Sequence, residues 1–150
     1  MLRTGHHLDD ATIRARYEHV GHRGGLGRRF ARRVIALAGA PARGRVADIG
    51  CGTGELLREL AETWPPSELV GVDFAASRLR TAAAAAPPVT LVDADLGAGL
   101  PFADAVFDAV FCTEVLEHLK DPVRCLREIR RVLAPGGRLT LSVPLSLIHI

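Results

Sequence analysis

The chain has 150 residues, of which 48% are hydrophobic and 24% charged, and its net charge is +2. This length suits one domain with its own buried core, and the composition is that of a soluble globular protein. No apolar run approaches the roughly 20 residues that a membrane span needs, and the N-terminus lacks a signal-peptide pattern. The three scattered cysteines predict neither a disulfide framework nor a zinc site, so we expect a cytoplasmic protein without a membrane span.

Arginines crowd the first third of the chain, a feature that a nucleic-acid surface would share. No aromatic side chains interleave with them as stacking platforms, so we favour the solvated face of a helix and expect no nucleic-acid partner. Four histidines in the same region cross a predicted loop, and we interpret them as solvated surface: His6, His7, His19 and His22.

Apolar periodicity, glycines and prolines divide the rest of the chain into alternating helices and strands. The first helix is amphipathic and places Leu26, Phe30, Val34 and Leu37 at helical spacing. The predicted elements, in chain order, are helix 26–39, strand 44–50, helix 54–64, strand 68–73, helix 75–86, strand 89–95, strand 105–112, helix 121–134 and strand 138–144. Asp121 followed by Pro122 is a strong start for the last helix. Strands that are apolar on both faces predict a parallel sheet covered by helices on each side.

The turn between the first strand and the next helix carries Gly50, Gly52 and Gly54, where side chains would block a ligand from the backbone. The helix that begins near Glu55 offers free N–H groups that can receive a carboxylate. A dinucleotide fingerprint would need a small residue where Glu55 stands, and Asp48 would meet a diphosphate unfavourably. A ligand with a positive charge fits this turn better.

Two further acids follow strand ends. Asp73 ends the second strand about 20 residues after the glycines, where acids accept hydrogen bonds from ribose hydroxyls; a helix N-cap is a compatible role. Asp95 ends the third strand and could receive the exocyclic amine of an adenine, and we prefer it to Asp93.

Four stretches, "VADIGCGTGELL", "LVGVDFAASRL", "DADLGAGLPFADAVFDAVFCTEVLEHLKDP" and "LREIRRVLAPGGRLTLSVP", resemble successive motifs of the class I S-adenosylmethionine-dependent methyltransferases. They are most similar to the small-molecule branch that includes ubiquinone and menaquinone biosynthesis enzymes. The resemblance implies binding of S-adenosyl-L-methionine, release of S-adenosyl-L-homocysteine and a small-molecule methyl acceptor. The cofactor-binding residues that it implies are Asp48, Gly50, Cys51, Gly52, Thr53 and Gly54 for the methionine part, Asp73 and Phe74 at the ribose, Asp95 and Leu96 at the adenine, and Cys112 and Thr113 on the floor.

The stretch "TEVLEHL" places Glu114, Glu117 and His118 at i, i+3 and i+4, which on a helix would share one face at the mouth of the site. One interpretation is a divalent metal site, or Glu114 and His118 as catalytic groups that deprotonate the acceptor. The other interpretation, which we favour over a metal, is a local helix turn that shapes the cofactor floor.

The resemblance implies an α/β, Rossmann-like, doubly wound and mostly parallel sheet of order 3-2-1-4-5, with the last two strands of the family missing. We divide the chain into a helical cap or lid at 1–43, a cofactor-binding core at 44–144 and an apolar tail at 145–150 that is expected to be non-native. Tyr17 and the hinge Gly24–Gly25 are the lid candidates. A truncated, inactive cofactor-binding fragment and an NAD(P)-dependent oxidoreductase domain stay open as alternatives to an active methyltransferase.

Overall fold

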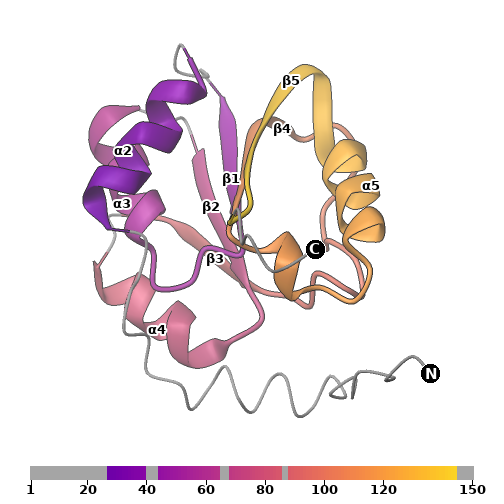
Figure 1. Cartoon of the computed structure of the whole chain (residues 1–150), viewed down its shortest axis with the longest axis horizontal. Coiled ribbons are helices and arrows are strands. Elements are labelled where there is room, and N and C mark those ends of the chain that lie inside the picture. The colour runs from indigo at the N-terminus through magenta and orange to yellow at the C-terminus, as the bar shows by residue number, and fades with distance from the viewer. Residues whose placement is uncertain (1–26, 40–43, 65–67, 86–87, 145–150) are drawn as a thin grey trace, which may run out of the picture.

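A computed structural model describes residues 27–39, 44–64, 68–85 and 88–144, in which helices and strands alternate (Figure 1). The five strands form one parallel sheet in the order β3-β2-β1-β4-β5, which confirms the expected Rossmann-like fold. The elements are α2 (Arg28–Leu37), β1 (Arg45–Ile49), α3 (Glu55–Thr63), β2 (Glu68–Asp73), α4 (Ala76–Ala85), β3 (Thr90–Asp93), β4 (Phe107–Thr113), the 3-10 helix η1 (Leu116–His118), α5 (Pro122–Val132) and β5 (Leu133–Ser142).

Strand order reverses between β1 and β4, so the carboxyl ends of these two strands flank the point where open parallel sheets bind ligands. Of the predicted cap at 1–43, the structure describes residues 27–39. The lid candidates Tyr17 and Gly24–Gly25, the four N-terminal histidines and the tail 145–150 lie outside the described residues. Among the described residues, no helix has both the length and the apolar character to cross a membrane.

Helices cover both faces of the sheet, which explains why its central strands are apolar throughout (Figure 1). Ile49 of β1 packs in one core with Ile129 of α5, whereas Val46 and Phe111 pack in a second core with α2 and α3. The predicted apolar face of α3 is confirmed, since its members are all buried: Leu56, Leu57, Leu60 and Trp64.

The predicted start of α5 is also confirmed. Asp121 is the N-cap, and its Oδ1 accepts a hydrogen bond of 2.9 Å from the backbone N–H of Arg124. Pro122 occupies the first turn, where its missing N–H leaves no intrahelical bond unmade. The local sequence therefore determines where this helix begins.

The buried face of α2 differs from the prediction. Ala31, Val34 and Ile35 face the core, while Phe30 is 36% and Leu37 84% exposed. On the flank of α2 that lies toward α3, Arg28 and Arg32 both pair with the buried carboxylate of Glu59 on α3. Leu26 lies outside the described residues.

The start of β5 also differs from the prediction, which placed a Pro-Gly-Gly turn between α5 and a strand from 138. The strand begins at Leu133, and its register with β4 shifts between Phe107↔Leu133 and Ala109↔Arg138. The extra residues form an irregularity inside the strand, where Gly136 takes a φ of +80°.

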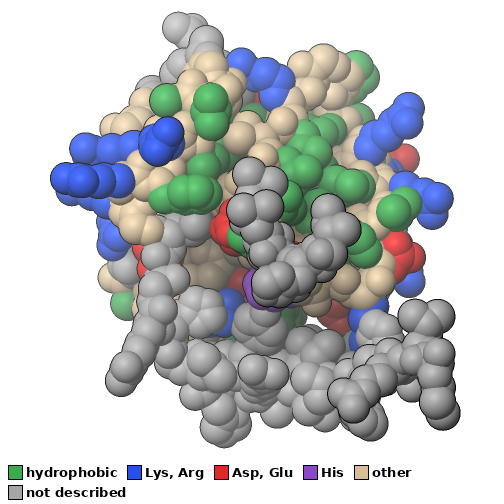
Figure 2. Space-filling model, in the orientation of Figure 1, with side chains coloured by type: hydrophobic (Ala, Val, Ile, Leu, Met, Phe, Trp, Pro, Cys, Tyr) green, Lys and Arg blue, Asp and Glu red, His purple; other side chains and the backbone are tan. Residues whose placement is uncertain are grey.

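The far side of β5 is an edge of the described sheet, as predicted. Leu139, Leu141 and Val143 alternate along it and are 38%, 42% and 47% exposed. Figure 2 shows hydrophobic side chains gathered on this face, over β5 and toward α5.

Candidate functional site

The turn after β1 uses its glycines for two purposes. Gly50, Gly52 and Gly54 have φ values of +81°, +55° and +85°, a region that favours glycine. A Cβ at Gly50 would lie 2.3 Å from Cγ2 of Val115, and one at Gly54 would lie 3.0 Å from the Cβ of Ala82. At Gly52 a Cβ would meet none of the described atoms within 4 Å. Gly50 and Gly54 are therefore required by packing, whereas Gly52 leaves bare backbone on an open side.

Asp73, at the end of β2, ties this turn to the neighbouring strand. Its Oδ2 accepts a 2.9 Å hydrogen bond from the N–H of Gly52, and its Oδ1 accepts one of 2.8 Å from the N–H of Ala75. The carboxylate is only 3% exposed. Each oxygen keeps a further lone pair, so the geometry leaves room for the predicted hydrogen bonds from ribose hydroxyls. The bond to Ala75, just before α4, also fits the predicted role at the start of that helix.

Asp48 is the most unusual acid of the site. It belongs to the central strand β1 and is only 1% exposed. Its Oδ1 has no hydrogen-bond partner among the described residues. Burial, together with the nearby charges of Asp73 and Glu55, raises the pKa of Asp48 to about 8. Such a group gains from a cationic donor, because the donor both pairs the oxygen and favours the charged form. A ligand with an ammonium group fits this requirement.

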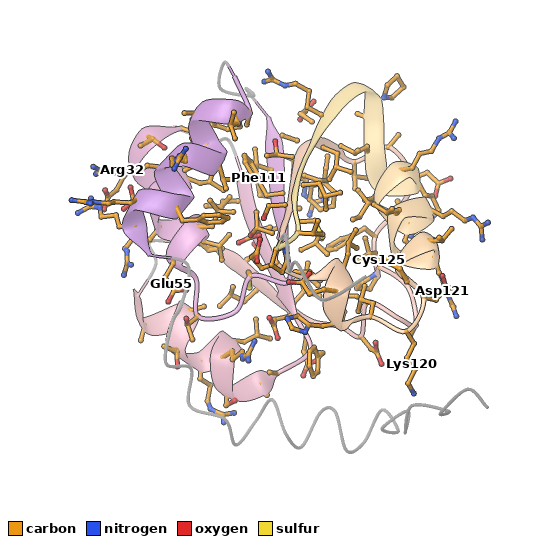
Figure 3. The ribbon with its side chains drawn as sticks, in the orientation of Figure 1. Arg32, Glu55, Phe111, Lys120, Asp121 and Cys125 are labelled. Atoms are coloured by element: carbon orange, nitrogen blue, oxygen red, sulfur yellow. The ribbon has the colours of Figure 1, made fainter. Side chains whose placement is uncertain are left out.

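The start of α3 already holds an acid. Glu55 is in the first turn, and its carboxylate accepts hydrogen bonds of 2.7 and 2.8 Å from the hydroxyl of Thr53. Its charge interacts favourably with the N-terminus of α3, where Figure 3 labels it. A ligand carboxylate at the N-terminus of α3 would therefore contact the backbone of the glycine turn beside the negative charge of Glu55.

The predicted adenine residues follow β3. Asp95 is exposed, and its Oδ1 accepts a 2.8 Å hydrogen bond from the N–H of Gly97, while Leu96 is buried at 4% exposure. Asp93, the alternative, pairs with Asp73 in the sheet and is exposed. Asp95 stands two residues beyond the end of β3, which suits an edge contact with a ligand.

The floor after β4 is closed and neutral. Cys112 is fully buried and Thr113 is 3% exposed, with its Oγ1 unpartnered among the described residues. The neighbouring Cys125 of α5 (Figure 3) and burial both raise the pKa of the Cys112 thiol, so that it stays protonated at neutral pH. Cys112 is therefore a packing residue and no nucleophile. Phe74 lies half-buried beside Asp73.

The prediction that Glu114, Glu117 and His118 share a helix face is wrong. Only Leu116–His118 is helical, as one 3-10 turn, and Glu114 precedes it with a φ of +55°. Glu117 and His118 are both exposed, with 3.7 Å between Oε1 and Nε2. Among the described residues, no three histidines, cysteines or acids are grouped as metal ligands. Glu114 cannot belong to the helix, because its positive φ is not a right-handed helical conformation. The helical turn therefore begins only after it, at Leu116.

Ser142 of β5 is a site residue that sequence reasoning missed. Its Oγ donates a 2.8 Å hydrogen bond to Oε1 of Glu114, and its carbonyl accepts one of 3.1 Å from the N–H of Glu114. These bonds hold Glu114 in its left-handed conformation, which costs a non-glycine residue about 1–2 kcal/mol. The partnership depends on the pairing of Thr113 with Ser142, so only the strand register could have indicated it.

The structure thus brings Asp48, Asp73, the glycine turn and Thr113 together at adjoining strand ends, with Asp95 farther along the same edge. A parallel doubly wound sheet with a glycine turn, an acid before the turn and an acid at the end of the second strand is typical of nucleoside-binding domains. The family described as a methyltransferase domain matches residues 47–141, and the chain belongs to this family. This match also decides between the ligand classes that the sequence left open, against the NAD(P)-dependent oxidoreductase.

Three known proteins show the range of the similarity. The chain is 42% identical over 117 residues to the demethylmenaquinone methyltransferase of Thermus thermophilus, which covers 75% of this chain and 53% of that protein. It is 39% identical over 116 residues to the trans-aconitate 2-methyltransferase of Azoarcus sp. (strain BH72). This match covers 77% of this chain and 45% of that protein. The crystal structure of an S-adenosylmethionine-dependent methyltransferase from Mesorhizobium loti superposes with a TM-score of 0.70 at 28% sequence identity. The superposition covers 79% of this chain and 56% of that chain.

These similarities confirm the predicted resemblance to the small-molecule methyltransferases. The chain spans about half the length of the curated relatives that it matches.

Proposed function

We propose that the chain binds S-adenosyl-L-methionine along the carboxyl ends of its strands and supports methyl transfer to a small-molecule acceptor, leaving S-adenosyl-L-homocysteine. The observation that carries this proposal is the buried Oδ1 of Asp48, unpartnered among the described residues, beside the open backbone of Gly52. An amino acid tail supplies what both lack, because its ammonium pairs the carboxylate and its small backbone-like end fits against glycine.

The other ligand contacts follow from the order of the strands. We assign the methionine part to Asp48 and the turn Gly50–Gly54, and the ribose to Asp73 with Phe74 beside it. We assign the adenine to Asp95 with Leu96, and the floor to Cys112 and Thr113: these two residues lie on β4, next to β1 in the sheet. The geometry of Asp73 supports its assignment to the ribose, since its carboxylate orients the glycine turn and keeps lone pairs that can accept from ribose hydroxyls.

The bound cofactor supplies a methyl group that is already activated by its sulfonium, so displacement by an acceptor lone pair needs no nucleophile from the protein. The work of this chain is to align the acceptor and exclude water. The buried neutral floor at Cys112 and Thr113 serves the second purpose.

Proton removal from the acceptor is the one further step to which side chains could contribute. We propose Glu114 as the stronger candidate, because Ser142 holds its carboxylate in place, and His118 as the weaker one, because its side chain is 51% exposed. A divalent metal is left out of the proposal, since Glu114 and the Glu117–His118 pair do not share a helix face.

The alternative of an inactive cofactor-binding fragment is not favoured, because the family match and the methyltransferase relatives support methyl transfer. Single-turnover methyl transfer by this chain separates the two, because such a fragment would bind S-adenosyl-L-homocysteine without transferring a methyl group. The three buried free thiols Cys51, Cys112 and Cys125 support a reducing, cytoplasmic setting for either.

Titration calorimetry with S-adenosyl-L-homocysteine and, as a control ligand, NADH tests the proposal directly. We expect heat of binding for the first and none for the second. Asp73→Ala should lower the affinity for S-adenosyl-L-homocysteine at least tenfold, since it removes both the ribose acceptor and the bond to Gly52. Asp108→Ala, at an exposed acid on the amino-terminal side of β4, is the matched control. No binding by the unchanged protein would overturn both candidate functions.

A further inference from the structure

A cluster of charged side chains on α5 fastens the loop between β3 and β4. Two nitrogens of Arg131 donate hydrogen bonds of 3.0 and 2.8 Å to the two carboxylate oxygens of Glu128. The same guanidinium donates bonds of 3.0 Å to the carbonyl of Leu100, 2.7 Å to the carbonyl of Phe102 and 2.8 Å to Oδ1 of Asp104. Glu128 completes the cluster by accepting a 3.0 Å bond from the N–H of Leu100. We call this set the α5 clasp.

The α5 clasp uses the donor geometry of arginine fully. Its planar fork binds Glu128 in a bidentate way while the remaining donors reach the loop, which the three point-like donors of a lysine cannot reproduce. The guanidinium lowers the pKa of Glu128 to about 2, so the carboxylate stays charged throughout the physiological range. The ion pair is therefore not lost by protonation in this range, and the donors of Arg131 that point at backbone carbonyls hold the path of the loop itself.

The same loop begins with the turn that carries the predicted adenine residues. Within the turn, Asp95 accepts hydrogen bonds at its side chain from Gly97 and at its carbonyl from the N–H groups of Ala98 and Gly99. These bonds are local and shape the turn itself. The residue before Asp95 is held by the sheet, because the N–H of Ala94 donates a 3.1 Å bond to the carbonyl of Asp73 on β2. The far side of the turn is held by α5, because Arg124 donates a 3.0 Å bond to the carbonyl of Ala98.

Apolar packing continues the connection. Leu96 and Leu100, at 4% and 5% exposure, belong to the same core cluster as Cys125 and Ile129 of α5. The α5 clasp therefore holds one end of a segment that is packed against α5 and whose other end presents Asp95 at the edge of the site.

We propose that Arg131, supported by Glu128, is a positioning residue for adenine recognition: it sets the turn that presents Asp95 and Leu96. The inference rests on the proposed function, because it assumes that the adenine lies at this turn. It predicts that loosening the α5 clasp weakens discrimination of the base more than it weakens binding of the amino acid tail at Asp48.

The test compares two ligands, S-adenosylhomocysteine and S-inosylhomocysteine, in which an oxo group replaces the exocyclic amine. In the unchanged protein, Asp95 accepts from the amine but opposes the oxo oxygen, so we expect about a tenfold preference for the adenosyl ligand. Arg131→Met and Glu128→Gln should each reduce this preference to about threefold or less. Arg130→Met, at an exposed arginine on the same helix outside the α5 clasp, should keep it.

The ratio of affinities separates positioning from general destabilisation. A smaller folded fraction lowers both apparent affinities by the same factor and leaves their ratio unchanged. If Arg131→Met does not fold, the Glu128→Gln ratio decides, because that substitution keeps the side-chain shape. An unchanged ratio in the variants, or no preference in the unchanged protein, overturns the inference while S-adenosylhomocysteine binding still upholds the proposed function. Failure of both ligands to bind the unchanged protein overturns the function itself.

Discussion

Replacing the buried carboxyl of Asp48 by a neutral amide should stabilise the ligand-free protein and weaken its ligand affinity. The pKa of Asp48 rises from 3.8 to about 8 on folding, chiefly through burial. The folded chain therefore binds one proton more than the unfolded chain between these pH values. Its contribution to the free energy of unfolding is fully present below pH 4 and falls as pH rises through about 8.

The magnitude follows from the shift. At about 1.4 kcal/mol for each pKa unit, ionisable Asp48 costs the folded state about 3 kcal/mol at pH 6 and about 5–6 kcal/mol above pH 8. Asp48→Asn removes this dependence, since the amide resembles the protonated acid in shape and does not titrate. The free energy of unfolding of the variant minus that of the unchanged protein should therefore grow steadily from pH 5 to pH 8.

Urea unfolding at pH 5, 6, 7 and 8 measures this difference. Asp93→Asn, at an exposed carboxyl on β3, is the matched control and should stay within about 0.5 kcal/mol of the unchanged protein at each pH. Calorimetry adds a second readout. Binding of S-adenosyl-L-homocysteine to the unchanged protein should strengthen by up to tenfold for each pH unit between 6 and 7.5, as Asp48 ionises against the ligand ammonium, whereas the variant should show weak binding without this slope.

A stability difference that does not change with pH would refute the reasoning on burial. A variant with the affinity and pH slope of the unchanged protein would refute the assignment of Asp48 to the ligand ammonium, whatever its stability.

Two further pairs of substitutions test the glycine turn and the candidate base. Gly50→Ala should lower the free energy of unfolding by about 2–4 kcal/mol, because its Cβ would collide with Val115 at a positive φ. Gly52→Ala should cost about 1–2 kcal/mol in urea unfolding yet lower S-adenosyl-L-homocysteine affinity at least tenfold; equal losses of stability in the two variants would contradict the assignment. Glu114→Gln should reduce the rate of methyl transfer about 10²-fold or more and flatten its pH profile, as measured in single-turnover assays. His118→Ala should reduce it less than fivefold, and the reverse order would make His118 the base.

Local chemistry determined much of what the structure contains. Strand and helix alternation, the Asp121 cap and the apolar face of α3 depend on neighbouring residues, so the printed sequence predicts them. The glycine turn and the acids Asp48 and Asp73 are likewise visible as motifs, because residues at the carboxyl ends of parallel strands must meet at one edge.

Sequence patterns failed where a residue's partner lies far along the chain. The face of α2 was predicted only in part: Val34 is buried, but Phe30 and Leu37 are exposed. Ala31 and Ile35 take their place in the core, and Arg32 pairs with Glu59, more than 25 positions away on α3. The helix through Glu114 was also wrong, because Ser142 of β5 holds that residue at a positive φ.

By itself, then, the sequence determined the order of elements, the glycine turn and the acids that lie at the strand ends. Only the tertiary structure decided how these groups act. It shows that Asp48 is buried with an oxygen unpartnered among the described residues, that Asp73 fastens the glycine turn, and that Arg131 of α5 holds the loop after Asp95. The physical reason is that burial and directed hydrogen bonds depend on distances between segments that are remote in sequence. A motif records which groups are present, while the packed sheet and its helices determine their charge and orientation.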